Sequence, residues 1–384
     1  MTAEKNPYDV VVVGGGAVGL FLACLLGRRG LGCRVLEQRS EPHPHSRSIG
    51  IHPPSLERFR DAGIVDPFLD AGVRIERGHV FSHRRRFGTL SFAHCPPPYR
   101  FVLSLPQRET ERILEEAAIA ICGPAIERGV TVTGIHRDPE GAWVEGQRES
   151  GEALRLRARF VVGCDGSHST VRRQAGIPFP GADYPDTYVM GDAEETTRFG
   201  SDACIYLARE GLVESFPLPG GLRRWVVKVP GPQAAPDTTR FCRAVRERTG
   251  QELPAEAVHS CNAFGVQGYC AARASSNRCL LAGDAAHVMS PFGGQGMNVG
   301  WMDAWDAADR LQRIVKDGAG VGTESALYDA RVTKRARRAI QRAEINLQLG
   351  REGKARVARN LLIRAMLMPP MNRILARAFT MRWM

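Results

Sequence analysis

The sequence lacks the patterns that mark several common classes of protein. Its ten cysteines form no C-x-x-C pair, and no cysteine–histidine cluster has the spacing of a zinc finger. We therefore predict no metal site and expect buried free thiols in a reducing compartment. Internal repeats are also absent, so a repeat array is excluded, and two or three ordinary globular domains fit the 384 residues.

Long hydrophobic runs are scarce as well. The most apolar stretch, 10–26, is short for the ~20 residues that a bilayer span requires, and it holds four glycines. The opening residues 1–9 are polar and lack the apolar core of a secretory signal. From these features we expect a cytoplasmic protein.

Acidic residues are nearly absent from the end of the sequence. Residues 331–384 hold 14 lysines and arginines against 2 aspartates and glutamates, whereas residues 1–330 hold 38 against 39. The net charge of +11 therefore arises in this tail. No nucleic-acid-binding motif accompanies the charge, so we expect no nucleic acid as a partner. The simplest interpretation is a set of basic helices packed on the body of the protein; a peripheral membrane contact or a homodimer through the tail is the alternative.

A strand–loop–helix–strand pattern opens the chain. Residues 8–13 include four consecutive valines and predict a buried strand, residues 17–29 place apolar side chains at helical spacing, and residues 34–37 begin a second strand. Between the first strand and the helix stands GGGAVG at 14–19, which fits G-x-G-x-x-G, and Glu37 follows about 20 residues later. Such a loop alone is weak evidence, but in this context it predicts a dinucleotide-binding site.

The residues of this motif have separate expected roles. Gly14 permits the tight turn, Gly16 lets the backbone approach a pyrophosphate, and Gly19 lets the helix pack closely on the strand. The helix N-terminus offers free N–H groups and a positive dipole to the phosphates. Glu37 would accept hydrogen bonds from the ribose hydroxyls of the adenosine. These roles suit either FAD or a nicotinamide cofactor.

Three further motifs lie downstream. FVVGCDGSHSTVR at 160–172 is an apolar strand that runs into Asp-Gly, and CLLAGDAAH at 279–287 is another strand that ends at Gly-Asp. PFGGQGMN at 291–298 is a glycine-rich loop that leads into a helix. Together with the opening motif, and in this order, they resemble the para-hydroxybenzoate hydroxylase-like family of single-component FAD-dependent monooxygenases. The resemblance covers roughly residues 7–315.

The resemblance implies FAD as the cofactor and gives roles to the downstream motifs. Asp284 would accept hydrogen bonds from the ribityl hydroxyls. Asp165 would lie near the pyrophosphate and take part in binding the nicotinamide cofactor, although a turn or helix cap is the alternative for this carboxylate. No catalytic side chain is assigned beyond the flavin itself. The loop expected near the isoalloxazine is Pro291, Phe292, Gly293 and Gly294.

Two further contacts follow from the resemblance. Arg47 resembles the family's arginine that lies over the flavin. Gln107, favoured over Arg108 by its register with the following residues, resembles the glutamine at a helix start that touches FAD. The complete set of expected cofactor-binding residues is Gly14, Gly16, Ala17, Val18, Gly19, Glu37, Arg47, Gln107, Asp165, Gly283, Asp284, Pro291, Gly294, Gly296, Met297 and Asn298.

The implied fold is α/β, with a Rossmann-like FAD-binding domain built on a parallel sheet, a β-sheet substrate domain and a C-terminal helical segment. The FAD-binding domain is expected to be discontinuous, because strand patterns typical of a separate layer interrupt it. The expected boundaries are 1–75, 98–180 and 268–330 for the FAD-binding domain, 76–97 and 181–267 for the substrate domain, and 331–384 for the basic helices.

The implied activity is that of a monooxygenase. NADPH or NADH, as a transient co-substrate, would reduce FAD, and O₂ would then form a flavin hydroperoxide. That species would hydroxylate or epoxidise an aromatic, lipophilic or otherwise electron-rich small molecule. The protein needs no nucleophile for this chemistry, and it must exclude water and position the substrate. His52 and His287 could carry protons, but structural roles are the simpler expectation.

Three alternatives stay open at this point. A flavin halogenase would carry a W-x-W-x-I-P segment and a substrate-side lysine, which we do not find here; Trp225 stands instead in Arg-Trp-Val. An FAD-dependent polyprenyl reductase shares the fold. A non-oxygenating flavoprotein that shields an unstable intermediate would also fit the motifs.

Overall fold

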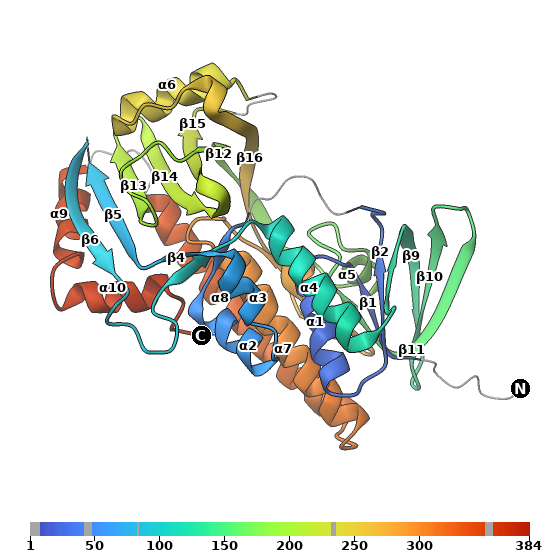
Figure 1. Cartoon of the computed structure of the whole chain (residues 1–384). Helices are drawn as coiled ribbons and strands as arrows, with labels where there is room; N and C mark the ends of the chain where they lie inside the picture. The colour runs from blue at the N-terminus through green and yellow to red at the C-terminus, as the bar shows by residue number, and fades with distance from the viewer. Residues whose placement is uncertain (1–7, 42–47, 83, 232–235, 350–355) are drawn as a thin grey trace, which may run out of the picture.

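The computed structural model describes residues 8–41, 48–82, 84–231, 236–349 and 356–384. Figure 1 shows two sheet-centred parts with a group of long helices alongside them. The described residues form two eight-stranded sheets and one three-stranded sheet. The predicted α/β fold, with a parallel sheet, a second β-sheet layer and a helical C-terminal part, is confirmed.

The first sheet consists of β1 (Tyr8–Val13), β2 (Cys33–Glu37), β8 (Ile126–Arg128), β9 (Val130–Arg137), β10 (Ala142–Arg148), β11 (Ala153–Gly163), β17 (Ser275–Ser276) and β18 (Cys279–Leu281). Its centre is parallel: β1 pairs with β2 on one side and β11 on the other, and β8 and β18 continue these two directions. The strand order reverses at β1, and ligands of open α/β sheets bind at the carboxyl ends of the strands at such a point.

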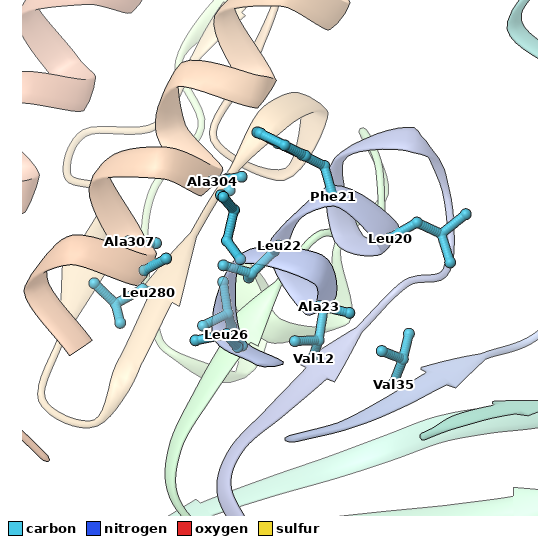
Figure 2. Packing of buried hydrophobic residues seen from close by; sticks show 14 of the residues in the cluster. Val12, Leu20, Phe21, Leu22, Ala23, Leu26, Val35, Leu280, Ala304 and Ala307 are labelled. Carbon is cyan, nitrogen blue, oxygen red and sulfur yellow. The ribbon is translucent and has the colours of Figure 1, made fainter. Parts of the chain in front are cut away.

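The helix α1 (Ala17–Arg28) lies in the core beside this sheet. Nine of its residues are buried, because apolar side chains surround it on almost every side. It packs against both α4 (Gln107–Cys122) and α7 (Gln295–Val315). Figure 2 shows the side chains of α1 between Ala304 and Ala307 of α7 and Val12 and Val35 of the strands. This packing fixes the N-terminus of α1 at the end of β1.

The second sheet consists of β5 (Arg77–Ser82), β6 (Arg85–Ser91), β12 (Gly181–Glu194), β13 (Ala203–Ala208), β14 (Gly211–Leu218), β15 (Leu222–Val229), β16 (Val258–Cys270) and β19 (His287–Val288). Two segments far apart in sequence therefore join through a parallel pairing of β5 with β13. The helix α6 (Thr238–Thr249) covers one face with Phe241 and Val245 (Figure 1). The opposite face carries side chains that line a cavity.

Short elements connect these layers. A three-stranded sheet and several short helices lie between the longer elements along the chain, and residues of β3, β4, β7, α5 and η3 line the cavity. They are β3 (Gly50–Ile51), β4 (Val73–Ile75), β7 (Val102–Ser104), α2 (Pro53–Asp61), α3 (Asp66–Ala71), α5 (Thr170–Gln174), η1 (Pro219–Gly221), η2 (Ala255–Ala257) and η3 (Gly283–Ala285).

The basic tail forms α8 (Val321–Leu349), α9 (Arg356–Met366) and α10 (Met371–Phe379). α8 packs on α7, and α10 packs on β6. Arg382 forms an ion pair with Glu57, and Met381 is fully buried, so the end of the tail is held against the body. In the described residues no helix is both long enough and apolar enough to cross a membrane.

Candidate functional site

One large cavity brings the four motifs together. It has a volume of about 1440 Å³, and its wall extends from the glycine-rich loop after β1 to the inner face of the second sheet. Pockets for a single drug-sized ligand are usually ~300–1,000 Å³. The cavity therefore has room for a dinucleotide and for a second molecule beside it.

The glycines of the opening motif have different surroundings. Gly14 has a φ of +106°, and a Cβ there would lie 2.3 Å from the carbonyl oxygen of Cys164. A Cβ at Gly19 would lie 1.9 Å from the carbonyl oxygen of Gly14. At Gly16 the nearest atom to a Cβ would be Glu111 Oε1, at 3.8 Å. Gly14 and Gly19 are thus required by the turn and by packing, whereas Gly16 keeps the approach from the cavity open.

The N-terminus of α1 faces this opening. Gly16, the N-cap residue, provides no side-chain cap, and the Glu111 carboxyl of α4 accepts a hydrogen bond from the backbone N–H of Ala17. Ala17 and Val18, which begin the helix, both line the cavity. The helix dipole and the backbone N–H groups of the first turn other than that of Ala17 are available to an anionic group such as a pyrophosphate.

Glu37 holds the loop from the end of β2. Its Oε2 accepts a hydrogen bond of 2.6 Å from the backbone N–H of Gly15, and its Oε1 accepts one of 2.9 Å from Arg39. The side chain is buried within the protein and also lines the cavity. Each oxygen has a second lone pair, so Glu37 can still accept a hydrogen bond from a ribose hydroxyl.

Asp165 lines the cavity and also caps a helix. Its Oδ2 accepts hydrogen bonds from the backbone N–H groups of Thr170 (2.7 Å) and Val171 (3.1 Å) at the start of α5, and its Oδ1 accepts one of 2.5 Å from Ser169. Burial raises the pKa of this carboxyl, while these hydrogen bonds oppose the rise. The cap that was the alternative interpretation is present, and any cofactor contact must be made beside it.

Asp284 is presented to the cavity from a rigid base. It is exposed on η3 and lines the cavity. Behind it, the fully buried Asp303 accepts hydrogen bonds from Gly283 N (3.2 Å) and Arg335 (2.8 Å) and pairs with His287 at 2.5 Å. His287 is fully buried and does not line the cavity, so its role is structural.

The glycine-rich loop before α7 is held by a histidine and an asparagine. Gly293 and Gly294 both have positive φ, at +86° and +61°. His52 Nε2 lies 3.0 Å from the carbonyl oxygen of Gly293, and burial lowers the pKa of His52 to about 4, so this ring is neutral near neutral pH. Asn298 donates to the carbonyl oxygens of Gly50 (2.8 Å) and Gly294 (2.7 Å).

The structure brings most of the predicted site residues to one wall. Gln107 begins α4. Its Nε2 donates a 2.8 Å hydrogen bond to Glu111 Oε1, which lies near Gly16 at the start of α1. Arg47 lies outside the described residues. The predicted residues that line the cavity are Gly14, Gly16, Ala17, Val18, Glu37, Gln107, Asp165, Asp284, Pro291, Gly294, Gly296 and Met297, together with Phe292 and Gly293.

Three predicted contact residues do not line the cavity: Gly19, Gly283 and Asn298. The Asn298 side chain is used within the protein, because its oxygen also accepts hydrogen bonds from His52 N (2.9 Å) and Ser55 (2.8 Å). All four of its hydrogen-bonding positions are then occupied. These residues support the site from behind, and Asn298 joins the loop to α2.

The motifs do not identify the residues that form the wall opposite them. Apolar side chains of the second sheet line it, and so do residues of α8, α9 and α10 such as Arg342, Ile363 and Phe379. The alternation of side chains between the two faces of a strand could have identified those that face the cavity. The tail could not have been assigned to the cavity, because its position depends on long-range packing.

The chain is similar to known proteins over most of its length. The family described as "FAD binding domain" matches residues 7–343. A rifampicin monooxygenase of Streptomyces venezuelae is 34% identical over 322 residues, which is 82% of this chain and 66% of the relative. The chain spans 58–66% of the length of the first three curated relatives that it matches.

Two solved structures extend the comparison. The p-nitrophenol 4-monooxygenase PnpA of Pseudomonas putida has a TM-score of 0.86 and 25% identity, with coverage of 98% of this chain and 97% of that one. The Diels-Alderase PyrE3 of pyrroindomycin biosynthesis has a TM-score of 0.81 and 30% identity, with coverage of 97% and 80%. The same fold therefore occurs in proteins named for oxygenation and in one named for a cycloaddition.

Proposed function

The chain belongs to the FAD-binding-domain family of para-hydroxybenzoate hydroxylase-like flavoproteins, and from that membership we propose that it is an NAD(P)H-dependent monooxygenase of an aromatic or other electron-rich small molecule. The observation that carries the proposal is the shared cavity. It joins a dinucleotide loop, followed by the N-terminus of α1, to an apolar wall on the second sheet. Bound FAD would supply reduced flavin that reacts with O₂ and transfers one oxygen atom.

The residues of this chain would perform three tasks. Gly16 and the N-terminus of α1 would bind the pyrophosphate, and Asp284 would bind the ribityl hydroxyls. The uncapped first turn of α7, after Gly294, would direct backbone N–H groups at negative charge that develops on the flavin. The apolar wall would exclude water from the reacting atoms.

We further propose a division of labour along the chain. Segments 1–75, 98–180 and 268–330 would bind FAD, and segments 76–97 and 181–267 would bind the substrate. Residues 331–384 would close the cavity, because Leu367 and Phe379 form part of its wall.

The proposal predicts a yellow protein with substrate-dependent turnover. Purified protein is expected to release FAD on mild denaturation, because no covalent attachment is expected. A panel of phenols, quinolines, polyketide quinones and polyprenyl phenols is expected to contain compounds that raise the rate of NADPH or NADH oxidation at least ~10-fold. The products would be examined by mass spectrometry for one added oxygen atom. A colourless protein that FAD cannot reconstitute would refute the proposal.

A second candidate function is a non-oxygenating role on the same scaffold. The likeness to the Diels-Alderase PyrE3 favours it, and so does 32% identity over 351 residues to a dialkyldecalin synthase of Streptomyces rugosporus. Such a protein would bind FAD and an apolar ligand without oxidising NAD(P)H in response to any ligand. The turnover assay above therefore separates the two functions.

We also propose that the tail makes a peripheral contact with anionic membranes. Leu361, Leu362 and Ile374 are 54–63% exposed on α9 and α10, in a segment rich in arginine. Each basic group near an anionic surface contributes ~1 kcal/mol, and salt weakens the attraction. The protein is expected to sediment with anionic vesicles at low salt and to be released at high salt. Binding that ignores lipid charge, or that does not occur at low salt, would contradict this prediction.

A further inference from the structure

The wall of the cavity contains an isolated carboxyl group, that of Glu214 on β14. The strand register places Glu214 opposite Ile205 of β13 on one side and Val226 of β15 on the other. Leu212 and Phe216, two residues away along β14, face the same side. All four of these neighbours are apolar, and all of them line the cavity with Glu214.

Two charged side chains of this sheet, Glu214 and Arg224, line the cavity, and they differ in their partners. In the part of the chain that the structure describes, no hydrogen bond or ion pair reaches the carboxyl group of Glu214. Arg224 is held by Asp192 at 2.6 Å, and Lys228 is held by Asp186 at 2.7 Å. Those two strand neighbours are therefore neutralised by carboxylates of β12.

The surroundings of Glu214 change its acidity. Burial raises the pKa of Glu214 to about 8, and no neighbouring charge contributes to that shift. The other charged groups on the cavity wall that could face it include Arg338 and Arg342 of α8. Glu214 is half-buried and lines the cavity, so its carboxyl is accessible to a molecule bound there. Such a group in a cavity is more typical of a ligand-binding site than of a structural position.

We propose that Glu214 binds the hydroxyl group of a phenolic or enolic substrate and accepts its proton; the proposal rests on the monooxygenase function above. In the proton transfer, the substrate O–H bond breaks and a new O–H bond forms on the Glu214 carboxylate. The electron pair of the broken bond stays on the substrate oxygen. The resulting anion is richer in electrons at the ring carbons, which favours attack on an electrophilic oxygen.

The geometry and the acidity of Glu214 together predict a pH-dependent selectivity. Below about pH 8 the carboxyl is neutral and can donate a hydrogen bond to a phenol or to an ether alike. Above about pH 8 it is ionised and only accepts, so that a phenol retains its partner and a methyl ether loses it. The preference for a phenol over its methyl ether should therefore increase as the pH rises.

The test measures binding to the FAD-loaded protein without NAD(P)H. Equilibrium dialysis would compare 2-naphthol with 2-methoxynaphthalene at about pH 6 and about pH 8.5, on either side of the pKa of Glu214. The wild type is expected to prefer 2-naphthol ~10-fold or more at the higher pH. In Glu214→Gln the preference is expected to be small and independent of pH. Glu210→Gln, at an exposed position in the same hairpin, should behave as the wild type.

The thermal stability of the Glu214 variants serves as a control for folding. The pKa of Glu214 is above its ordinary value of 4.5 in the folded protein, so its contribution to stability is lost as the pH rises toward and through about 8. Glu214→Gln and Glu214→Leu should therefore fold, and their gain in thermal stability over the wild type should be larger at about pH 8.5 than at about pH 6.

Two results would overturn the proposal. One is a wild-type protein that binds neither compound or does not prefer 2-naphthol at the higher pH. The other is a preference that persists unchanged in Glu214→Gln. Because no turnover is involved, either result is independent of whether the protein oxygenates its substrate.

Discussion

Replacing Gly19 by alanine is expected to abolish FAD retention and to destabilise the fold. The new Cβ would lie 1.9 Å from the carbonyl oxygen of Gly14, a backbone atom that cannot move without opening the turn between β1 and α1. Overpacking of this kind usually costs ~1–3 kcal/mol, and here it would also displace the helix N-terminus from the phosphate site. The measurements are the molar ratio of flavin to purified protein and the thermal unfolding temperature.

Two matched glycine variants make this prediction specific. Gly322→Ala, on the exposed start of α8, meets no atom within 4 Å and is expected to behave as the wild type. Gly16→Ala has its nearest neighbour at 3.8 Å, so the protein should fold while its affinity for FAD falls. If Gly19→Ala kept as much FAD as Gly322→Ala, the assignment of this turn would be wrong.

Asp303→Ala is expected to cause the largest loss of stability of any single carboxylate change. Asp303 is fully buried, and its removal takes from His287 its carboxylate at 2.5 Å and from Arg335 the one at 2.8 Å, which leaves Arg335 paired with Asp306 alone. Removal of one partner from a buried charged pair typically costs ~3–5 kcal/mol. The hydrogen bond that Asp303 accepts from Gly283 is lost as well, so the Asp284 loop should bind FAD more weakly.

The control for this variant is on the same helix. Asp309→Ala removes a carboxylate that is 35% exposed and whose contacts with Arg310 and Arg313 are 3.7 Å and 3.5 Å long. Exposed pairs of this kind contribute ~0–1 kcal/mol. Urea unfolding of both variants and of the wild type measures how much free energy of unfolding each substitution removes. Equal losses of stability in the two variants would contradict a structural role for the buried Asp303 cluster.

Local sequence patterns identify the part of the cavity wall that is built from short segments, namely the turn after β1 and the carboxylates at the ends of parallel strands. The turn after β1 requires glycine at two positions for steric reasons that are visible in the motif, and a carboxylate at the end of a parallel strand reaches the same edge of the sheet as its neighbours. Glu37, Asp165 and Asp284 therefore line one cavity, and their contacts with FAD stay a prediction. The orientation of the Asn298 amide could not be predicted in this way. The amide turns away from the cavity because its oxygen accepts hydrogen bonds from His52 and Ser55, which are more than 240 positions away in the sequence.

The net charge of the tail does not predict which of its arginines are paired with carboxylates. Composition alone counts every arginine as exposed, whereas Arg335 lies between Asp303 and Asp306, and Arg382 is paired with Glu57. Acidic partners from the body of the protein neutralise part of the basic excess. Glu214 was missed for the converse reason, since only the pairing of β13, β14 and β15 reveals that its neighbours on the sheet are apolar.

The most direct measurement is the fate of isotopically heavy O₂ in a turnover with FAD-loaded protein, NADPH or NADH, and a compound from the panel that stimulates its oxidation. The account predicts a product that carries one heavy oxygen atom, with consumption of one reduced nicotinamide per product. A product that contains no oxygen from O₂, or FAD-loaded protein that transforms its ligand without oxidising the nicotinamide, would contradict the assignment as a monooxygenase.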